Sequence, residues 1–390
     1  MTLVWGTAQH APGTGPRTHV FIVGVGRYRH LLGGASPTPG APPLGQLTSP
    51  PISARALARW FTSPKFANAH APLGSLEMLL SDSTGQIFDG VQVDDATSDK
   101  IQTAFDAWKQ RCHADPGNIA FFYFCGHGLQ KDVVALLPED FAASENNLWK
   151  HSIDFDKTYV GMVRCRAGTQ FFVVDACREL SQTAIKDEEF GGTALISPRL
   201  GDSHLRTAPK LFATALGRQA FGDSNGVSRL TGALIECLDG LGATDDGPEW
   251  VINTTQLGIA VQSLVRHQNE VLKIPENNRQ IVDPAGGDLA NGPQRLLVFP
   301  AGSSPTVIVK FGCNPSSIAE KVTFFAVPEN GPKLPAPNPG PWITTVSAGL
   351  YVFGCSFNLA AGPSDVPAPR VFVRPPIYHT QINVPPPHPV

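Results

Sequence analysis

Two continuously apolar stretches constrain the fold of this chain most strongly. "NIAFFYF" (118–124) and "QFFVVD" (170–175) have no polar residue at alternate positions, as expected for strands covered on both faces. The first stretch is followed by a histidine between two glycines, His127, and the second by a polar cluster containing Cys177. The sequence therefore predicts a sheet with layers on both faces and reactive side chains just beyond two of its strands.

The rest of the first 300 residues alternates between strand-like and helix-like segments. Apolar runs predict strands at 19–24, 75–81 and 210–215, with a short strand or hairpin at 133–138. Spacing and capping residues predict helices at 52–61, 97–112, 154–165, about 228–240 and 254–270. Such alternation favours an α/β sandwich around a mostly parallel sheet.

The composition changes after residue 305. Short β-rich runs such as "TVIVKF" and "LYVFGCSF" are separated by proline, glycine and asparagine, so we predict a small β-sandwich over 306–375. Residues 376–390 read as a proline-rich, extended tail. The α/β part is assigned to 17–300, and within it the polar stretch at about 180–209 is expected to be an exposed, flexible linker.

Composition excludes several classes of protein. A chain of 390 residues with a net charge of −3 has no basic excess that would indicate a nucleic-acid partner. No apolar run is long enough to cross a membrane, and the first residues do not resemble a secretory signal. The seven scattered cysteines lack CxxC pairs, which argues against zinc and favours a reducing, cytoplasmic location.

His127 and Cys177 are the candidate catalytic pair. Sites in parallel sheets gather at the carboxyl ends of the strands, where both residues are expected to lie. A cysteine nucleophile needs a base to take its proton and donors for the oxyanion. The backbone N–H groups of Gly128 and Cys177, expected outside any ladder, would be the donors. Taken singly, the cysteine reads as a buried, inert thiol and the histidine as a structural one.

The sequence resembles the caspase–metacaspase superfamily of cysteine peptidases over residues 17–300. The resemblance rests on "HVFIVGVGRYRHL", "FFYFCGHG", "FFVVDACRE" and "LFATALGRQAFGD…SRLTGALIECL". The histidine lies fifty residues before the cysteine, which matches a signature known for caspases. The resemblance implies a caspase-like three-layer sandwich in which His127 is the general base and Cys177 the nucleophile. The oxyanion donors would be the N–H groups of Gly128 and Cys177.

Asp175 departs from the animal caspases, which carry glutamine two residues before the nucleophile. In metacaspases the matching aspartate lies in the pocket for the side chain that precedes the scissile bond. A carboxylate there pairs with arginine or lysine and repels acidic side chains, so cleavage after Arg, then Lys, is predicted. The alternative is that Asp175 only binds backbone N–H groups at the strand end. A second departure, "CREL" after the nucleophile in place of C-H-S-G, leaves the following loop without a family template.

The remaining cysteines and one acidic cluster receive structural interpretations. Cys125 is assigned to packing, and Cys313 and Cys355 to the core of the β-domain. Asp187-Glu188-Glu189 is similar to a feature of calcium-dependent metacaspases, but as a charge run in a loop it is assigned to solvated surface. No cofactor or metal is therefore expected, with calcium as the alternative.

The expected activity would need control. Lys186, Arg199 and Arg206 lie in the 180–209 stretch, where a peptidase cutting after basic residues could cut itself or be cut by an upstream protease. Resemblance to prokaryotic caspase-like peptidases implies a zymogen that acts as a cell-death or phage-defence effector under a regulatory protein. The β-domain would dock a partner, guard the active site, bind substrate or simply stabilise the chain.

Three functions compete. The leading one is an endopeptidase that cleaves protein substrates after Arg or Lys. The second is a catalytically silent caspase-like scaffold that recruits partners through the β-domain, which the presence of both His127 and Cys177 disfavours. The third is a peptidase with aspartate specificity, which Asp175 disfavours.

Overall fold

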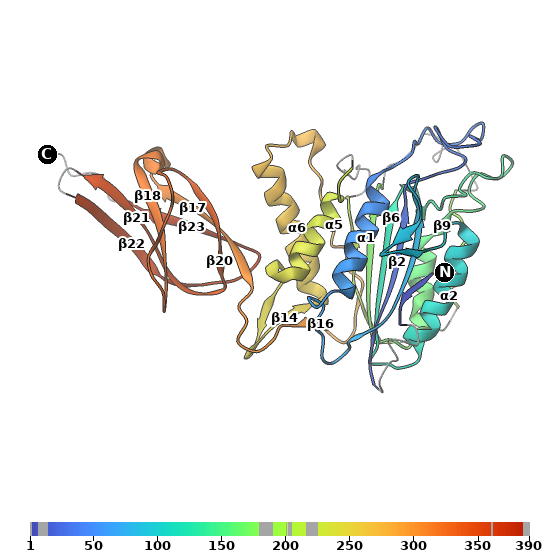
Figure 1. Ribbon diagram of the computed structural model, residues 1–390, viewed down its shortest axis with the longest axis horizontal. Coiled ribbons are helices and arrows are strands. Elements are labelled where there is room, and N and C mark those ends of the chain that lie inside the picture. The colour runs from blue at the N-terminus through green and yellow to red at the C-terminus, as the bar shows by residue number, and fades with distance from the viewer. Residues whose placement is uncertain are drawn as a thin grey trace. The chain divides into compact units, whose positions relative to one another are not determined.

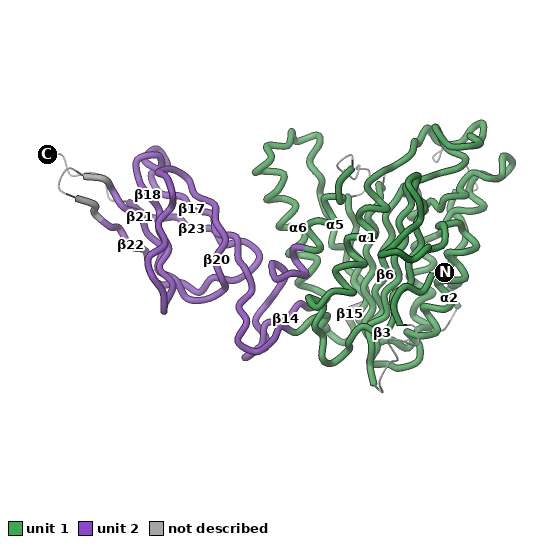
Figure 2. The backbone as a smooth tube through the Cα atoms, in the orientation of Figure 1, with its two compact units in different colours: residues 1–235, 253–298 green, residues 236–252, 299–390 purple. Residues whose placement is uncertain are grey.

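The computed structural model describes residues 2–6, 15–178, 190–199, 201, 205–215, 225–359 and 362–384. The chain divides into two compact units (Figure 2). The first unit comprises residues 1–235 and 253–298, and the second comprises 236–252 and 299–390.

A mostly parallel sheet forms the centre of the first unit. The strand order is β1-β3-β2-β6-β10-β11-β15, and β12 also pairs with β10. Strands β2, β3, β6, β10, β11 and β12 run parallel, whereas β1 and β15 are antiparallel to their neighbours. The strands are β1 (Leu3–Trp5), β2 (Thr18–Val25), β3 (Leu73–Ser81), β6 (Ile119–Gly126), β10 (Thr169–Ala176), β11 (Thr207–Ala208), β12 (Lys210–Phe212) and β15 (Asp288–Leu289).

Helices cover both faces of this sheet. In Figure 1, α1, α5 and α6 lie on one side and α2 on the other. The helices are α1 (Ser49–Thr62), α2 (Ser98–His113), α3 (Phe155–Gly161), α5 (Arg229–Glu236) and α6 (Thr254–Val271). Smaller strands are β4 (Ile87–Phe88), β5 (Val91–Gln92), β7 (Gly128–Gln130), β8 (Val134–Leu136), β9 (Ile153–Asp154) and β16 (Arg295–Val298).

The aromatic run of β6 packs both helical layers onto the sheet. Phe122 stacks against Phe21, with ring centroids 5.6 Å apart, and lies near Trp108 of α2. Phe121 points the other way and contacts Phe61 of α1, with centroids 4.8 Å apart. Successive side chains of a strand point to opposite faces, so an unbroken apolar run is what a doubly covered strand requires.

The expected flexible linker is in part wrong. Leu195 and Ile196 are buried in the core of the first unit, and Phe190 packs against it. Thr193 bridges to Ile153 of β9, and its carbonyl accepts a hydrogen bond from the Asp154 N–H. This part of the 180–209 stretch is anchored because it supplies apolar side chains to the core and backbone bonds to β9. Residues 179–189, 200 and 202–204 lie outside the described residues.

The second unit is built from mostly antiparallel sheets. One has the order β20-β17-β23 and another the order β19-β18-β21-β22, with a β13–β14 hairpin besides. Cys313 and Cys355 are buried in its apolar core, as predicted. Its strands are β13 (Thr244–Asp246), β14 (Glu249–Asn253), β17 (Thr306–Asn314), β18 (Val322–Pro328), β19 (Leu334–Pro335), β20 (Trp342–Ser347), β21 (Gly349–Leu359), β22 (Gly362–Val373) and β23 (Ile377–Asn383).

The predicted fold class, an α/β sandwich followed by an all-β part, is confirmed. Two details differ from the expectation. Much of the proline-rich tail is strand β23, which pairs in parallel with β17 over Ile308↔Ile377 to Asn314↔Asn383. Residues 236–252 also belong to the second unit, although the predicted helix at about 228–240 extends into them. Among the described residues, no helix is long and apolar enough to cross a membrane.

Candidate active site

The register between β6 and β10 brings the two sequence motifs together. The strands run parallel, and Cα partners include Asp175↔Cys125 and Ala176↔Gly126. His127 and Cys177 are therefore the first residues beyond a matched pair of strand ends. The predicted adjacency of the two strands is confirmed, and parallel strands present such residues at one edge of the sheet.

Two glycines allow the chain to turn at this edge. A Cβ on Gly126 would lie 2.7 Å from the Tyr28 hydroxyl, and one on Gly128 would lie 2.8 Å from the Cys177 carbonyl oxygen. Both distances are shorter than carbon can approach oxygen without displacement. Glycine is required on each side of His127 because the backbone is packed against the groups that form the site.

The imidazole of His127 is held through one nitrogen. Its Nε2 lies 2.8 Å from the carbonyl oxygen of Gly45, which can only accept a hydrogen bond. Nε2 therefore carries the proton in the neutral ring, and Nδ1 remains as the basic nitrogen. Burial lowers the pKa of His127 below its usual value, while the hydrogen bond to Gly45 acts in the opposite direction. Near neutral pH the ring is ready to accept a proton.

Tyr28 contacts both the backbone and the ring of His127. The backbone N–H of His127 donates to the Tyr28 hydroxyl at 2.7 Å, and the two ring centroids are 4.8 Å apart. Burial raises the pKa of the Tyr28 hydroxyl well above its usual value, and the nearby thiols of Cys125 and Cys177 act in the same direction. Tyr28 therefore stays protonated beside the candidate pair and fixes the backbone that carries the imidazole.

The expectation that Gly128 lies outside any ladder is wrong. Gly128 begins β7 and faces Leu136 of β8. The Leu137 N–H donates to the His127 carbonyl, whereas the His127 N–H donates to Tyr28. The Gly128 N–H stays the predicted oxyanion donor.

Asp175 lies at the end of β10 with 4% of its surface exposed. Its Oδ2 accepts hydrogen bonds from Ser228, Thr231 at 2.6 Å and Tyr123 at 3.4 Å. Burial raises the pKa of Asp175, although the hydroxyl donors favour its charged form. The partners of this carboxylate are therefore side-chain hydroxyls. Cys125 is buried against this carboxylate, which raises the pKa of its thiol further beyond the effect of burial.

Arg178 shows how the chain continues after Cys177. Its Nε donates to Gln130 of β7 at 2.7 Å, and its Nη1 pairs with Asp283 at 2.7 Å. The guanidinium also lies over the Phe212 ring, 4.2 Å from the centroid. Three separate segments thus hold the residue next to Cys177, and a planar guanidinium suits such a combination of stacking and forked hydrogen bonding.

The processing candidates have different environments. Arg199 is exposed. Arg206 is 1% exposed, and its guanidinium donates to Gln170 at 2.9 Å and to the Tyr159 carbonyl at 3.0 Å. The expectation of an exposed basic residue is therefore wrong at Arg206. Lys186 and the acidic cluster 187–189 lie outside the described residues.

Sequence reasoning missed Gly45, Tyr28 and the Ser228–Thr231 pair. Gly45 acts through its carbonyl, so its residue type carries no signal. Ser228 had a detectable one, because its hydroxyl accepts a hydrogen bond from the Thr231 N–H and caps α5. Nothing in the local pattern would have linked that cap to a carboxylate fifty-three residues earlier.

Comparisons with known proteins agree with this geometry. The chain is 31% identical over 182 residues to the uncharacterized protein y4kE of Sinorhizobium fredii, a match that covers 46% of this chain. The match spans about half of that relative, 52% of its length. The family model of the caspase domain matches residues 20–283, which includes β6, β10 and both candidate catalytic residues. The chain belongs to the caspase domain family of cysteine peptidases.

Proposed function

We propose that this protein is a cysteine endopeptidase in which Cys177 is the nucleophile and His127 the general base. One observation supports the proposal: His127 and Cys177 directly follow the paired ends of β6 and β10, and Gly45 binds Nε2 of His127 so that Nδ1 is the basic atom. The lowered pKa of His127 keeps that atom unprotonated near neutral pH.

The proposed reaction follows from these groups. Nδ1 of His127 takes the proton of the Cys177 thiol as sulfur adds to the scissile carbonyl carbon. The N–H groups of Gly128 and Cys177 bind the resulting oxyanion. The imidazolium then gives its proton to the leaving amine as the C–N bond breaks. Water hydrolyses the thioester, and the thiol is regenerated with the carboxylate product.

We propose cleavage after arginine, then lysine. Asp175 is the acidic side chain closest in sequence to Cys177 on the described part of β10, and three hydroxyls bind the same oxygen of its carboxylate. This arrangement fixes the carboxylate rigidly two residues before the nucleophile. Paired with a substrate cation, the buried charge would be compensated, whereas an acidic substrate side chain would add a second uncompensated charge.

The test is hydrolysis of fluorogenic tetrapeptides ending in Arg, Lys or Asp. We expect turnover of the Arg peptide that is lost in Cys177→Ala and in His127→Ala. Asp175→Asn should weaken the preference for Arg. Cys313→Ala, which removes a buried thiol from the second unit, is the matched control and should keep full activity. Turnover of the Asp peptide would overturn the specificity, and no turnover after the chain has been nicked would favour the scaffold function.

Control by cleavage is part of the proposal. Arg199 is exposed and follows the anchored residues Leu195 and Ile196, so a protease could reach it in the folded protein. Lys186 remains a second candidate for the cleavage site. Arg206 is no longer a candidate, because a protease cannot reach its buried side chain. If the protein cuts itself, the active form should be cleaved at one of these sites and the Cys177→Ala form should stay full length. If both stay full length while the active protein turns over substrate, self-cleavage is not needed.

A defence role is proposed by analogy with prokaryotic caspase-like peptidases, with the second unit as the candidate surface for a regulatory protein. The test compares phage plaque counts on bacteria that express the wild type or Cys177→Ala. Equal counts would contradict the role without affecting the peptidase assignment. Addition and chelation of calcium in the peptide assay tests the remaining cofactor question.

A further inference from the structure

The loop after β2 supplies two groups that hold His127. Tyr28, three residues beyond the end of β2, accepts the backbone N–H of His127, and Gly45 accepts its ring N–H. These two groups are seventeen residues apart in the chain, on the outgoing and returning arms of one loop. Their separation must stay constant for the imidazole to keep its orientation.

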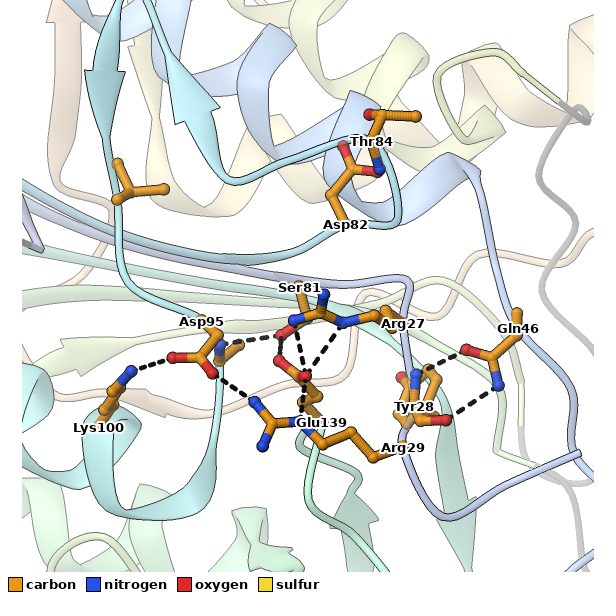
Figure 3. Close-up of polar contacts among 12 residues, drawn as sticks. Arg27, Tyr28, Arg29, Gln46, Ser81, Asp82, Thr84, Asp95, Lys100 and Glu139 are labelled. Carbon is orange, nitrogen blue, oxygen red and sulfur yellow. Dashed lines mark hydrogen bonds and ion pairs between the residues drawn. The ribbon is translucent and has the colours of Figure 1, made fainter. Parts of the chain in front are cut away.

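The side chain of Gln46 connects the two arms directly. Its Oε1 accepts the Tyr28 N–H at 2.7 Å, and its Nε2 donates to the Tyr28 carbonyl at 3.0 Å and to the Leu32 carbonyl at 2.9 Å. Both protons of the amide and its oxygen are therefore engaged. Figure 3 shows the amide of Gln46 against both backbone groups of Tyr28.

The outgoing arm is anchored independently. Arg27 and Arg29, on either side of Tyr28, both bind Glu139, whose side chain is fully buried (Figure 3). The returning arm carries backbone bonds at Leu44 and Leu47. The Gly45–Gln46 peptide lies on the returning arm. Its orientation depends on the backbone dihedral angles of Gly45, and glycine has the widest conformational freedom of any residue. The carbonyl that binds His127 belongs to that peptide.

We propose that Gln46 is a positioning residue for the His127–Cys177 pair, which rests on the proposed peptidase function. By binding Tyr28 it prevents the Gly45–Gln46 peptide from rotating and so keeps the Gly45 carbonyl on Nε2. The tautomer with a basic Nδ1 is thereby maintained. All three hydrogen bonds of Gln46 go to the backbone of its own loop, so it acts through the orientation of His127.

The test measures alkylation of Cys177 by iodoacetamide, followed by mass spectrometry, at about pH 6.5 and about pH 9.5, either side of the pKa of about 8.5 of a free thiol. At the lower pH a rapid reaction needs the imidazole to remove the proton, whereas at the higher pH hydroxide does so. Gln46→Met preserves length and removes all three hydrogen bonds. Gln46 is exposed, so this change opens no cavity.

For Gln46→Met we expect alkylation about tenfold slower at the lower pH, equal to a barrier increase of about 1.4 kcal/mol, with little change at the higher pH. Peptide hydrolysis should show a similar fall in kcat with KM unchanged. Gln294→Met is the matched control. Its Nε2 also donates to two backbone carbonyls, those of Asn291 and Gly292, and Gly292 binds Thr207 near the amino ends of the strands.

The outcomes separate the two hypotheses. Rapid alkylation of wild type at the lower pH, lost in His127→Ala but retained in Gln46→Met, would overturn the role of Gln46 and leave the peptidase proposal intact. Equal rates for wild type and His127→Ala would overturn both. Slowing of Gln46→Met at both pH values would show collapse of the site and would also overturn a positioning role.

Discussion

The two units differ in what they bury. The first encloses charged side chains, namely Glu77, Glu139, Asp154, Asp175, Arg178 and Arg206. Within the described residues of the second unit, the only polar side chain buried to that degree is Thr380. Its ion pairs, such as Lys333–Asp365 and Arg370–Glu329, are at the surface.

We interpret part of this difference as a consequence of the candidate site in the first unit. Buried charges cost desolvation free energy and are kept where their position matters. Asp175 and Arg178 flank Cys177, and Glu139 anchors the arginines on either side of Tyr28. The second unit packs aromatic rings instead, such as Phe311 against Trp342 and Phe353. We infer that the first unit tolerates the cost of buried charges where they hold the candidate site.

Removal of Glu139 should give the largest loss of stability. Glu139→Ala leaves Arg27, Arg29 and the Ser81 hydroxyl without their shared acceptor, so we expect the free energy of unfolding to fall by about 3 kcal/mol. Glu329→Ala, which breaks an exposed pair in the second unit, is the control and should cost less than about 1 kcal/mol. Urea unfolding measures both. Equal losses would remove the distinction between the units.

Arg178→Met should affect catalysis more than stability. The variant keeps contact with Phe212 but loses Gln130 and Asp283, so the residue next to Cys177 can shift. We expect kcat to fall by about ten- to a hundredfold, the range that a displacement near 1 Å produces. Arg370→Met in the second unit serves as the control. Unchanged turnover by Arg178→Met would show that the buried guanidinium serves folding alone.

Much of the first unit could be predicted from sequence, because a strand that is buried on both faces has a continuous run of apolar residues. The run at β6 and the run at β10 were identified, and their parallel pairing followed from the helices between them. Short strands such as β11 and β15 were missed, since two residues carry no periodic signal. Strand β23 was missed because the surrounding prolines favour a loop, although Ile377–Asn383 alternates well enough to pair with β17.

The site was predictable only as far as side chains identify it. His127, Cys177 and Asp175 have reactive groups at strand ends and could be recognised. Gly45 contributes a carbonyl that any residue possesses, so no pattern marks it. Burial of Arg206 could not be inferred either, because its partners Gln170 and Tyr159 meet it only in three dimensions.

The pH dependence of turnover tests the buried histidine. Burial lowers the pKa of His127, so its basic form persists below the usual value of 6.5. We expect kcat/KM for the Arg peptide to fall on the acid side only at a pH below 6.5, because this parameter reports the ionisation of the uncomplexed enzyme. A profile of kcat/KM against pH measures the inflection. An acid limb at or above 6.5 would contradict the assignment of His127 as a buried base.

Asp175→Asn tests the cost of the charge beside the nucleophile. Burial raises the pKa of Asp175, so the folded state binds its proton more tightly than the unfolded chain does. Stability from this group is full below the unfolded value of 3.8 and is lost as pH rises through the folded pKa. The Tm of the variant relative to wild type should therefore rise between pH 4 and pH 7. A constant difference would show that the carboxylate carries no such penalty.

The smallest loss of stability is expected from substitution of Asp365 in the second unit. Its carboxylate accepts hydrogen bonds from Lys333 and Ser356, both at 2.6 Å, and these contacts lower its pKa. The lowered pKa means that any stability from the pair is present above 3.8 and is lost at lower pH. Because 48% of the Asp365 side chain is exposed, water screens the pair, and Asp365→Asn should cost less than about 1 kcal/mol. Calorimetry at high and low salt measures this loss. If it matched that of Glu139→Ala, the contrast between charges that are buried for a site and charges that are solvated would fail.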